Sequence, residues 1–358
     1  DKSTGACPVP GTPDDGTRDL RDDLSGDQYL TIYTVGFAGG DIRPVLQDTA
    51  DNAGGLAYAA EDGKQLKTSL EQAFTAAMSR STASSVAVNT GSITGSSKLY
   101  QAVFDSTDWT GDIEAFVVNT DGSVEPVASW KASTVLPDPA DRVIITYHDG
   151  VGEPFRWDDI PNMQADLVSS DVLDYLRGDA SNEEASGGVF RDRNKLLGDF
   201  INSAPVWVGP PAFHYPDNWP GAAAEDSAPY STFQTNRINR TPVVYAGAND
   251  GMMHAFDASD GSELFAYIPQ KVIPNLASLS DPNYVHRYFA DGSATVVEAY
   301  FTNGWHTVLA AGLNAGGQGI YALDVTNPGS FDTEANGAAK VLWEFHDSDD
   351  ADLGYTFS

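Results

Sequence analysis

Short apolar runs separated by glycine-rich turns dominate the pattern of hydrophobic and polar positions in the second half of the chain. Two runs, 243–248 and 252–257, flank an Asn-Asp-Gly turn at 249–251, and a third run follows at 263–269. Apolar runs joined by such turns predict β-hairpins, and three in succession predict a meander. The same layout returns at 307–324. Recurring meanders at this spacing favour a β-propeller.

A fainter copy of the pattern lies earlier in the chain, where apolar residues recur at every second position. This is the period of a half-buried strand. We expect strands at 99–105, 113–119 and 124–130, and a hairpin whose turn is the Asp149-Gly150 pair. Propellers close with four or more blades, and only about three meanders are visible. The predicted fold is therefore mainly β, with a β-propeller that is incomplete in this chain.

Two segments interrupt the strand pattern within the predicted propeller region, 81–358. The first is a connection at 138–205 that contains a helix at 164–176, which Gly178 is placed to end. The apolar side chains expected on the buried side of this helix are Leu167, Val168, Val172 and Leu176. The second is 210–240, whose five prolines predict a long excursion over the surface.

The N-terminal part of the chain has a different pattern. A near-continuous apolar run at 30–37 predicts a strand that is buried on both faces. A short helix at 46–50, a strand at 56–59 and a helix at 64–80 follow. This order predicts part of an α/β domain, over residues 1–80.

The charge balance narrows the classes of partner. The chain has 51 acidic and 20 basic residues and a formal net charge of −31. Such a surface repels phosphate backbones, so we expect no nucleic-acid partner. We interpret most of the acid as solvated surface, with calcium-binding surfaces as the alternative. No apolar run approaches the roughly 18 residues of a membrane span, so none is expected.

The densest group of carboxylates is Asp-Ser-Asp-Asp-Ala-Asp at 347–352. Asp347, Asp349 and Asp352 could ligate calcium if the turn brings their oxygens together. The spacing lacks the bidentate Glu and the central Gly of a complete calcium loop. A solvated turn between strands is therefore the alternative.

Arg177-Gly178-Asp179 is the tripeptide that integrin ligands use, and it predicts a receptor-binding site. The alternative is structural, because Gly178 already has a role at the end of the helix. Nucleophilic catalysis has no support. There is no Gly-x-Ser-x-Gly motif, and the single cysteine, Cys7, lies in a loop without an adjacent base.

Six sequence blocks together resemble the PilC/PilY family of type IV pilus-associated proteins. They run in the order of the family and cover roughly residues 86–358. The blocks are 88–105 with Asp-Trp-Thr-Gly-Asp at 108–112; Asp-Tyr-Leu-Arg-Gly-Asp at 174–179; Leu-Leu-Gly-Asp at 196–199 with Asn-Ser-Ala-Pro-Val at 202–206; 245–257; 316–324; and 342–345 with 352–356. Residues 1–80 look like the closing part of the von Willebrand A-like domain that family members often carry. The Asp-x-Ser-x-Ser metal motif of that domain is absent here.

The resemblance implies a non-enzymatic protein at the tip of type IV pili. Such proteins support pilus assembly, restrain retraction and adhere to surfaces. The implied partners are minor pilins, the pilus tip complex, and a host or abiotic surface, and the implied location is the cell surface. The family propeller carries a calcium loop, which we expect to lie outside this chain. The alternatives are a structural scaffold of a filament or surface layer, and a quinoprotein dehydrogenase, whose vicinal cysteine pair a single cysteine cannot supply.

Overall fold

The computed structural model describes residues 34–37, 44–52, 57–60, 65–66, 83–88, 97–221 and 223–357. The chain divides into two compact units, Asp1–Met78 and Ser79–Ser358. In the described residues, no helix is long and apolar enough to cross a membrane.

The first unit contains a strand–helix–strand arrangement. Strands β1 (Thr34–Phe37) and β2 (Ala57–Ala60) pair in parallel, with Thr34 opposite Ala57. Helix α1 (Pro44–Asn52) connects them, and the Thr34 hydroxyl donates a hydrogen bond to the Leu46 carbonyl oxygen at 3.0 Å. This order agrees with the α/β pattern of the sequence. Most of the helix expected at 64–80 lies outside the described residues, and the von Willebrand A-like interpretation stays a prediction.

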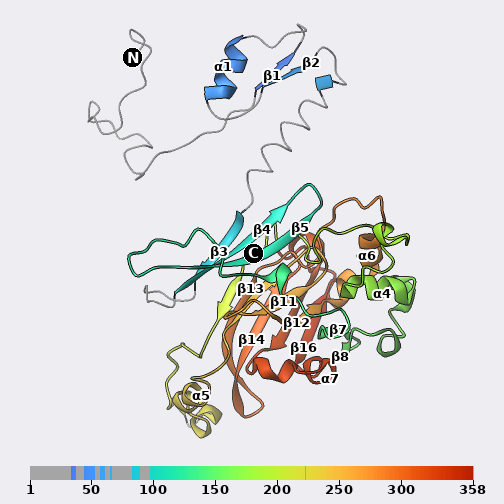
Figure 1. The fold of residues 1–358 in the computed structure, drawn as a ribbon. Coiled ribbons are helices and arrows are strands. Elements are labelled where there is room, and N and C mark those ends of the chain that lie inside the picture. The colour runs from blue at the N-terminus through green and yellow to red at the C-terminus, as the bar shows by residue number, and fades with distance from the viewer. Residues whose placement is uncertain are drawn as a thin grey trace, which may run out of the picture. The chain divides into compact units, whose positions relative to one another are not determined.

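The second unit is mainly β, as the sequence predicts (Figure 1). Its described strands form three sheets, in the orders β3-β4-β5-β6, β8-β7-β12-β11-β10-β9 and β13-β14-β15-β16. The strands are β3 (Ala83–Val88), β4 (Lys98–Asp105), β5 (Thr110–Val117), β6 (Trp130–Lys131), β7 (Ile144–His148), β8 (Val151–Pro154), β9 (Val206–Val208), β10 (Val243–Gly247), β11 (Met253–Asp257), β12 (Glu263–Ile268), β13 (Ala294–Phe301), β14 (Gly304–Gly312), β15 (Gly319–Asp324) and β16 (Val341–His346). The α-helices are α3 (Gln164–Leu167), α4 (Ser170–Arg177), α5 (Tyr230–Asn236), α6 (Ile273–Leu276) and α7 (Glu334–Ala338).

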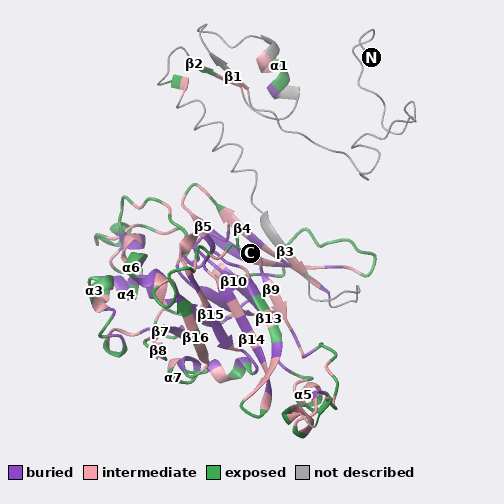
Figure 2. Cartoon of the chain, turned by 180° about the vertical axis from the view of Figure 1, so that it is seen from behind, coloured by how far each residue is buried: buried purple, intermediate pink, exposed green. Residues whose placement is uncertain are grey.

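The central sheet is packed on both faces. Val243 and Tyr245 of β10 belong to one hydrophobic cluster, together with Leu309 of the β13–β16 sheet. Val244 of the same strand belongs to a second cluster, together with Tyr100 of the β3–β6 sheet. Figure 2 shows the buried residues concentrated in these strands. Because successive side chains enter opposite cores, β10 is a continuous apolar run in the sequence.

The hairpins of the central sheet form where the turns were expected. Gly251 in the turn between β10 and β11 has φ +96°, a conformation that glycine adopts without steric cost. The Asp149-Gly150 pair also lies at positive φ, between β7 and β8. Strand β7 pairs in parallel with β12, so the 138–205 connection extends the central sheet.

Two sequence predictions are wrong in detail. Residues 124–130 do not form a strand; only Trp130–Lys131 pairs with β5 as β6, and Val124 makes an isolated bridge to Val118. Here the Asp121 carboxylate accepts hydrogen bonds from the backbone N–H and hydroxyl of Ser123, which stabilise a turn instead.

The helix expected at 164–176 is broken into α3 and α4. Val168, placed by the sequence on the buried side, has φ +70° and is 75% exposed. Ser169 begins the second helix, because its hydroxyl accepts a hydrogen bond from the N–H of Val172. Gly178 ends α4 in the left-handed conformation, at φ +116°, as predicted.

The proline-rich excursion at 210–240 is held by aromatic side chains. Tyr215 stacks on Trp305 of β14, with ring centroids 5.0 Å apart, and Tyr230 meets the same indole edge-on at 5.0 Å. The Trp305 indole N–H donates to the carbonyl oxygen of Ala228 at 2.8 Å. Such aromatic pairs stabilise beyond the area they bury. The segment is therefore fastened to the outer hairpin of the third sheet.

Glycines permit close backbone approach near the start of β13, both to the end of β14 and to β10. A Cβ atom on Gly292 would lie 2.0 Å from the carbonyl oxygen of Gly312, and one on Gly247 would lie 2.2 Å from that of Ala290. Carbon and oxygen cannot approach so closely, so a larger residue would have to push the neighbouring backbone segments apart.

We expect Gly292→Ala to lower the free energy of unfolding by about 1–3 kcal/mol, the range for an overpacked interior. Gly304→Ala is the matched control, because a Cβ there meets only the His306 ring, at 3.8 Å. Urea unfolding followed by fluorescence measures both variants. Equal unfolding midpoints for the two variants would contradict the close approach.

Candidate functional site at the junction of the sheets

Arg177, the last residue of α4, is 1% exposed and reaches into the interior. Its guanidinium pairs with Glu334 of α7 at 2.8 Å and donates to the carbonyl oxygens of Phe155 and Arg142 at 2.9 and 2.7 Å. One side chain thus connects the helical connection, the β7–β8 hairpin and α7. Such a buried cation is tolerated because both terminal nitrogens of the guanidinium are hydrogen-bonded, to Glu334 and to backbone carbonyl oxygens.

This placement gives no support to the receptor interpretation of Arg177-Gly178-Asp179, which stays a sequence prediction. A receptor that reads the tripeptide must reach the guanidinium, which is enclosed here. Gly178 terminates the helix, and the Asp179 carboxylate accepts a hydrogen bond from the Ser181 N–H at 2.7 Å. The structural alternative accounts for all three residues.

The carboxylates of the 347–352 loop are not brought together. Asp347 forms an ion pair with Lys271, and the Asp349 carboxylate accepts a hydrogen bond from the His346 N–H at 2.8 Å. Asp352 is exposed, and its N–H donates to the carboxylate of Asp350 at 3.0 Å. Within the described ranges, no three His, Cys, Asp or Glu residues are grouped so as to hold a metal ion. Calcium at this loop therefore gains no support from the geometry and stays a sequence prediction.

A chain of four charged side chains crosses the central sheet. Arg142 forms a bidentate pair with Glu263, with N–O distances of 2.6 and 2.8 Å. The two ring nitrogens of His254 contact Glu263 at 2.8 Å and Asp250 at 3.1 Å. The Gly198 N–H then donates to the Asp250 carboxylate at 2.9 Å. The sequence patterns above do not predict these contacts. The available signal was the presence of charged residues inside apolar strand patterns.

These contacts determine the protonation states of the side chains in the four-residue network. Burial alone would lower the pKa of His254, but the charges and hydrogen bonds of Asp250 and Glu263 outweigh it and raise the pKa to about 9. Burial would raise the pKa of Glu263, but the Arg142 charge outweighs it and lowers the pKa to about 2. Against burial, the charge of His254 also holds the pKa of Asp250 below its ordinary value. At neutral pH the four charges therefore cancel.

A second polar network lies beside the first. The Asn249 amide donates to Asp199 at 2.6 Å and to Asp291 at 3.3 Å, and it accepts from the Phe289 N–H at 2.9 Å. His286 contacts the other oxygen of Asp199 at 2.9 Å. Burial raises the pKa of Asp291. Asn249 thus joins carboxylates from segments on either side of the central meander.

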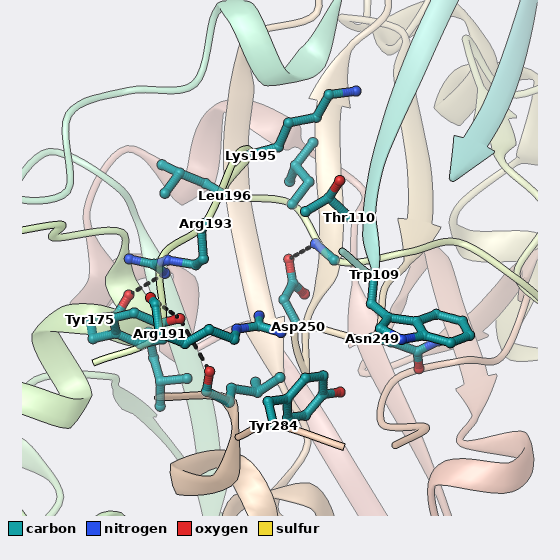
Figure 3. A pocket seen from close by; sticks show the side chains of 14 residues that line it. Trp109, Thr110, Tyr175, Arg191, Arg193, Lys195, Leu196, Asn249, Asp250 and Tyr284 are labelled. Carbon is teal, nitrogen blue, oxygen red and sulfur yellow. Dashed lines mark hydrogen bonds between the residues drawn. The ribbon is translucent and has the colours of Figure 1, made fainter. Parts of the chain in front are cut away.

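The two networks border a pocket that is lined in part by Trp109, Arg191, Asn249, Asp250 and Tyr284 (Figure 3). The turn between β4 and β5, the 191–198 segment and the β10–β11 turn meet here. The sequence pattern indicates only a turn at Asn249 and Asp250. Their side chains in fact connect the sheets.

Removal of the Arg177 guanidinium should be strongly destabilising, because the carbonyl oxygens of Phe155 and Arg142 would lose their buried donor and Glu334 would lose one of its two arginine partners. We expect Arg177→Ala to cost about 3–5 kcal/mol of unfolding free energy, the range for a broken buried ion pair. Arg237→Ala, at a partly exposed position, is the charge-matched control. If the two variants unfold at the same urea concentration, the assigned role of Arg177 is wrong.

The free energy of unfolding should be greatest between about pH 4.5 and 6.5. The raised pKa of His254 means that its pairing stabilises fully below about pH 6.5 and is lost as the pH rises through 9. The lowered pKa of Glu263 means that its contribution is present above about pH 4.5 and is lost as the pH falls toward 2. Urea unfolding at a series of pH values measures this profile.

His254→Gln should flatten the decline in stability between pH 6.5 and 9. His214→Gln, at an exposed position, should leave the slope unchanged. A decline that persists unaltered in His254→Gln would assign it to another group.

Comparison with known proteins places these residues in a family. The family model described as "PilY1 beta-propeller domain" matches residues 197–358 of this chain. This range contains β9 to β16 and therefore most of the central sheet and the whole β13–β16 sheet.

Full-length relatives extend the similarity to most of the chain. A type IV pilus biogenesis factor PilY1 homolog of Xylella fastidiosa is 33% identical over an alignment that covers 96% of this chain and 31% of its own length. The type IV pilus biogenesis factor PilY1 of Pseudomonas aeruginosa strain UCBPP-PA14 is 34% identical, covering 87% of this chain and 28% of its own. The chain thus spans about a third of the length of these relatives.

A solved structure, the C-terminal domain of Pseudomonas aeruginosa PilY1, is 41% identical over 42% of this chain and 27% of its own, with a TM-score of 0.30. The propeller-domain match and the relatives confirm the resemblance seen in the six sequence blocks: the chain belongs to the PilY1 family of type IV pilus biogenesis factors.

Proposed function

We propose that this chain is the propeller-bearing part of a pilus-tip protein that supports pilus assembly and restrains retraction. The observation that carries this proposal is the similarity to PilY1 proteins over most of the chain. A propeller whose sheets are joined by buried charges is a rigid support, and its loops provide surfaces for docking other proteins. The proposed partners are minor pilins and the tip complex, at the cell surface.

We further propose that the protein acts without catalysis. The buried histidine supports this view, because a pKa of about 9 keeps His254 protonated at neutral pH. An imidazolium held between two carboxylates is a structural cation and not a ready general base. The quinoprotein dehydrogenase remains the enzymatic alternative, and a filament or surface-layer scaffold the structural one.

Adhesion and calcium complete the proposal. We propose that the protein attaches pili to a host or abiotic surface. We place calcium modulation at a site elsewhere in the longer protein, because the 347–352 carboxylates are engaged with Lys271 and the backbone.

The test is a pull-down of the tagged full-length protein from native cells, analysed by mass spectrometry with and without a calcium chelator. We expect minor pilins to be enriched, because a tip protein must contact them, and their recovery to fall on chelation. An unrelated tagged surface protein from the same cells controls for carry-over.

Two outcomes would reject parts of the proposal. Absence of pilins together with a quinone absorbance in the purified protein would favour the dehydrogenase. Pilin recovery that is equal with and without chelator would remove calcium from the mechanism and leave the pilus assignment intact.

A further inference from the structure

A run of basic residues stands out in this acidic chain. Arg191, Arg193 and Lys195 occupy alternate positions and all line the pocket of Figure 3. They belong to a set of only 20 Lys and Arg residues in a protein of net charge −31. The segment that carries them is tied to the β4–β5 turn, because Asn194 donates to the Asp108 carboxylate at 2.7 Å.

Two of the three cations have carboxylate partners. Arg193 pairs with Glu183 at 2.7 Å and donates to the carbonyl oxygen of Tyr175 at 2.7 Å. Lys195 lies 3.5 Å from the buried carboxylate of Asp112. These pairs fix the segment and neutralise most of its charge.

Arg191 is different. Its guanidinium lies over the ring of Tyr284, with the central carbon 4.3 Å from the ring centroid. Its Nε is buried and has no hydrogen-bond partner within the described part of the chain. A buried N–H without a partner costs free energy, so this group is suited to an acceptor that comes from outside.

The one carboxylate that lines the pocket does not cancel the charge of Arg191. Asp250 is already paired with His254, and the four-residue chain to which it belongs has no net charge at neutral pH. Among the charged residues that line the pocket, Arg191 is therefore the one for which the described residues supply no ion-pair partner. Trp109 and Tyr284 supply flat apolar walls on the same pocket.

We propose that this pocket binds a single carboxylate group, held by the guanidinium of Arg191. The cavity volume of about 20 Å³ admits about one water-sized group, so it takes the oxygen end of a small anion such as a carboxylate and excludes a bulkier polyanion. A guanidinium offers parallel N–H groups that match the two oxygens of a carboxylate. The source is either an acidic residue of a partner protein or a small free acid. This site goes beyond the proposed function. A negative binding result would reject the site and would leave the proposed pilus function unaffected.

The test compares capped peptides Gly-Asp-Gly and Gly-Asn-Gly, with acetate as the free acid, by calorimetry on the protein. We expect the Asp peptide to bind at millimolar concentration or tighter, and the Asn peptide at least about tenfold more weakly, since the loss of a charge-assisted pair has that effect. NMR of the arginine Nε–H groups should show one signal that moves with the Asp peptide and is missing in Arg191→Lys.

Arg191→Gln should weaken binding of the Asp peptide at least about tenfold. Arg237→Gln is the matched control, because it removes the same charge at another partly exposed position outside the pocket. Tighter binding of the peptide than of acetate assigns the site to a partner protein, and equal binding assigns it to a small acid. Equal affinity for Asp and Asn peptides, equal affinity in the two variants, or no binding at millimolar concentration would overturn the proposal.

Discussion

The cost of burying charge governs how this protein is built. An ionised side chain removed from water must be paired and hydrogen-bonded, or it destabilises the fold by several kcal/mol. Arg142, Glu263, His254 and Asp250 satisfy that requirement together, and they come from β12, β11 and the loops beside them. Because each member needs its neighbours to remain charged, their strands and loops can take only a narrow range of relative positions. The pocket beside Asp250 depends on the same charge pairing, because a shift of the β10–β11 turn would move Asn249 and Asp250, which line it.

The parts of the fold that could be predicted from the sequence are those set by local pattern. The meander of β10, β11 and β12 follows from apolar runs and an Asn-Asp-Gly turn, and the end of α4 follows from Gly178. Where the prediction was wrong, a local hydrogen bond competed with periodicity. Ser169 caps a new helix after Val168, and Asp121 closes a turn where alternation suggested a strand.

The candidate site could not be derived in the same way, because its contacts join residues that are distant in sequence. Arg177 meets Glu334 across 157 positions, and Arg142 meets Glu263 across 121. A tripeptide motif carries no information about which way its arginine points, so Arg177-Gly178-Asp179 suggested a receptor site although the guanidinium is enclosed. Charged residues within an apolar pattern were the available hint, and they reveal burial without naming the partner.

The parallel pairing of β7 with β12 has a consequence for how the chain folds. Thr146 contacts Ile268 across 122 residues, so this edge of the central sheet can form only after the meander and the whole connection before it have been produced. Closing so long a loop slows folding relative to hairpins, whose partners are neighbours. The meander can assemble early from neighbouring hairpins. Its β12 edge then stays unpaired until the long loop closes and brings β7 beside it. Until β7 pairs with it, the β12 edge is open to mispairing with another chain.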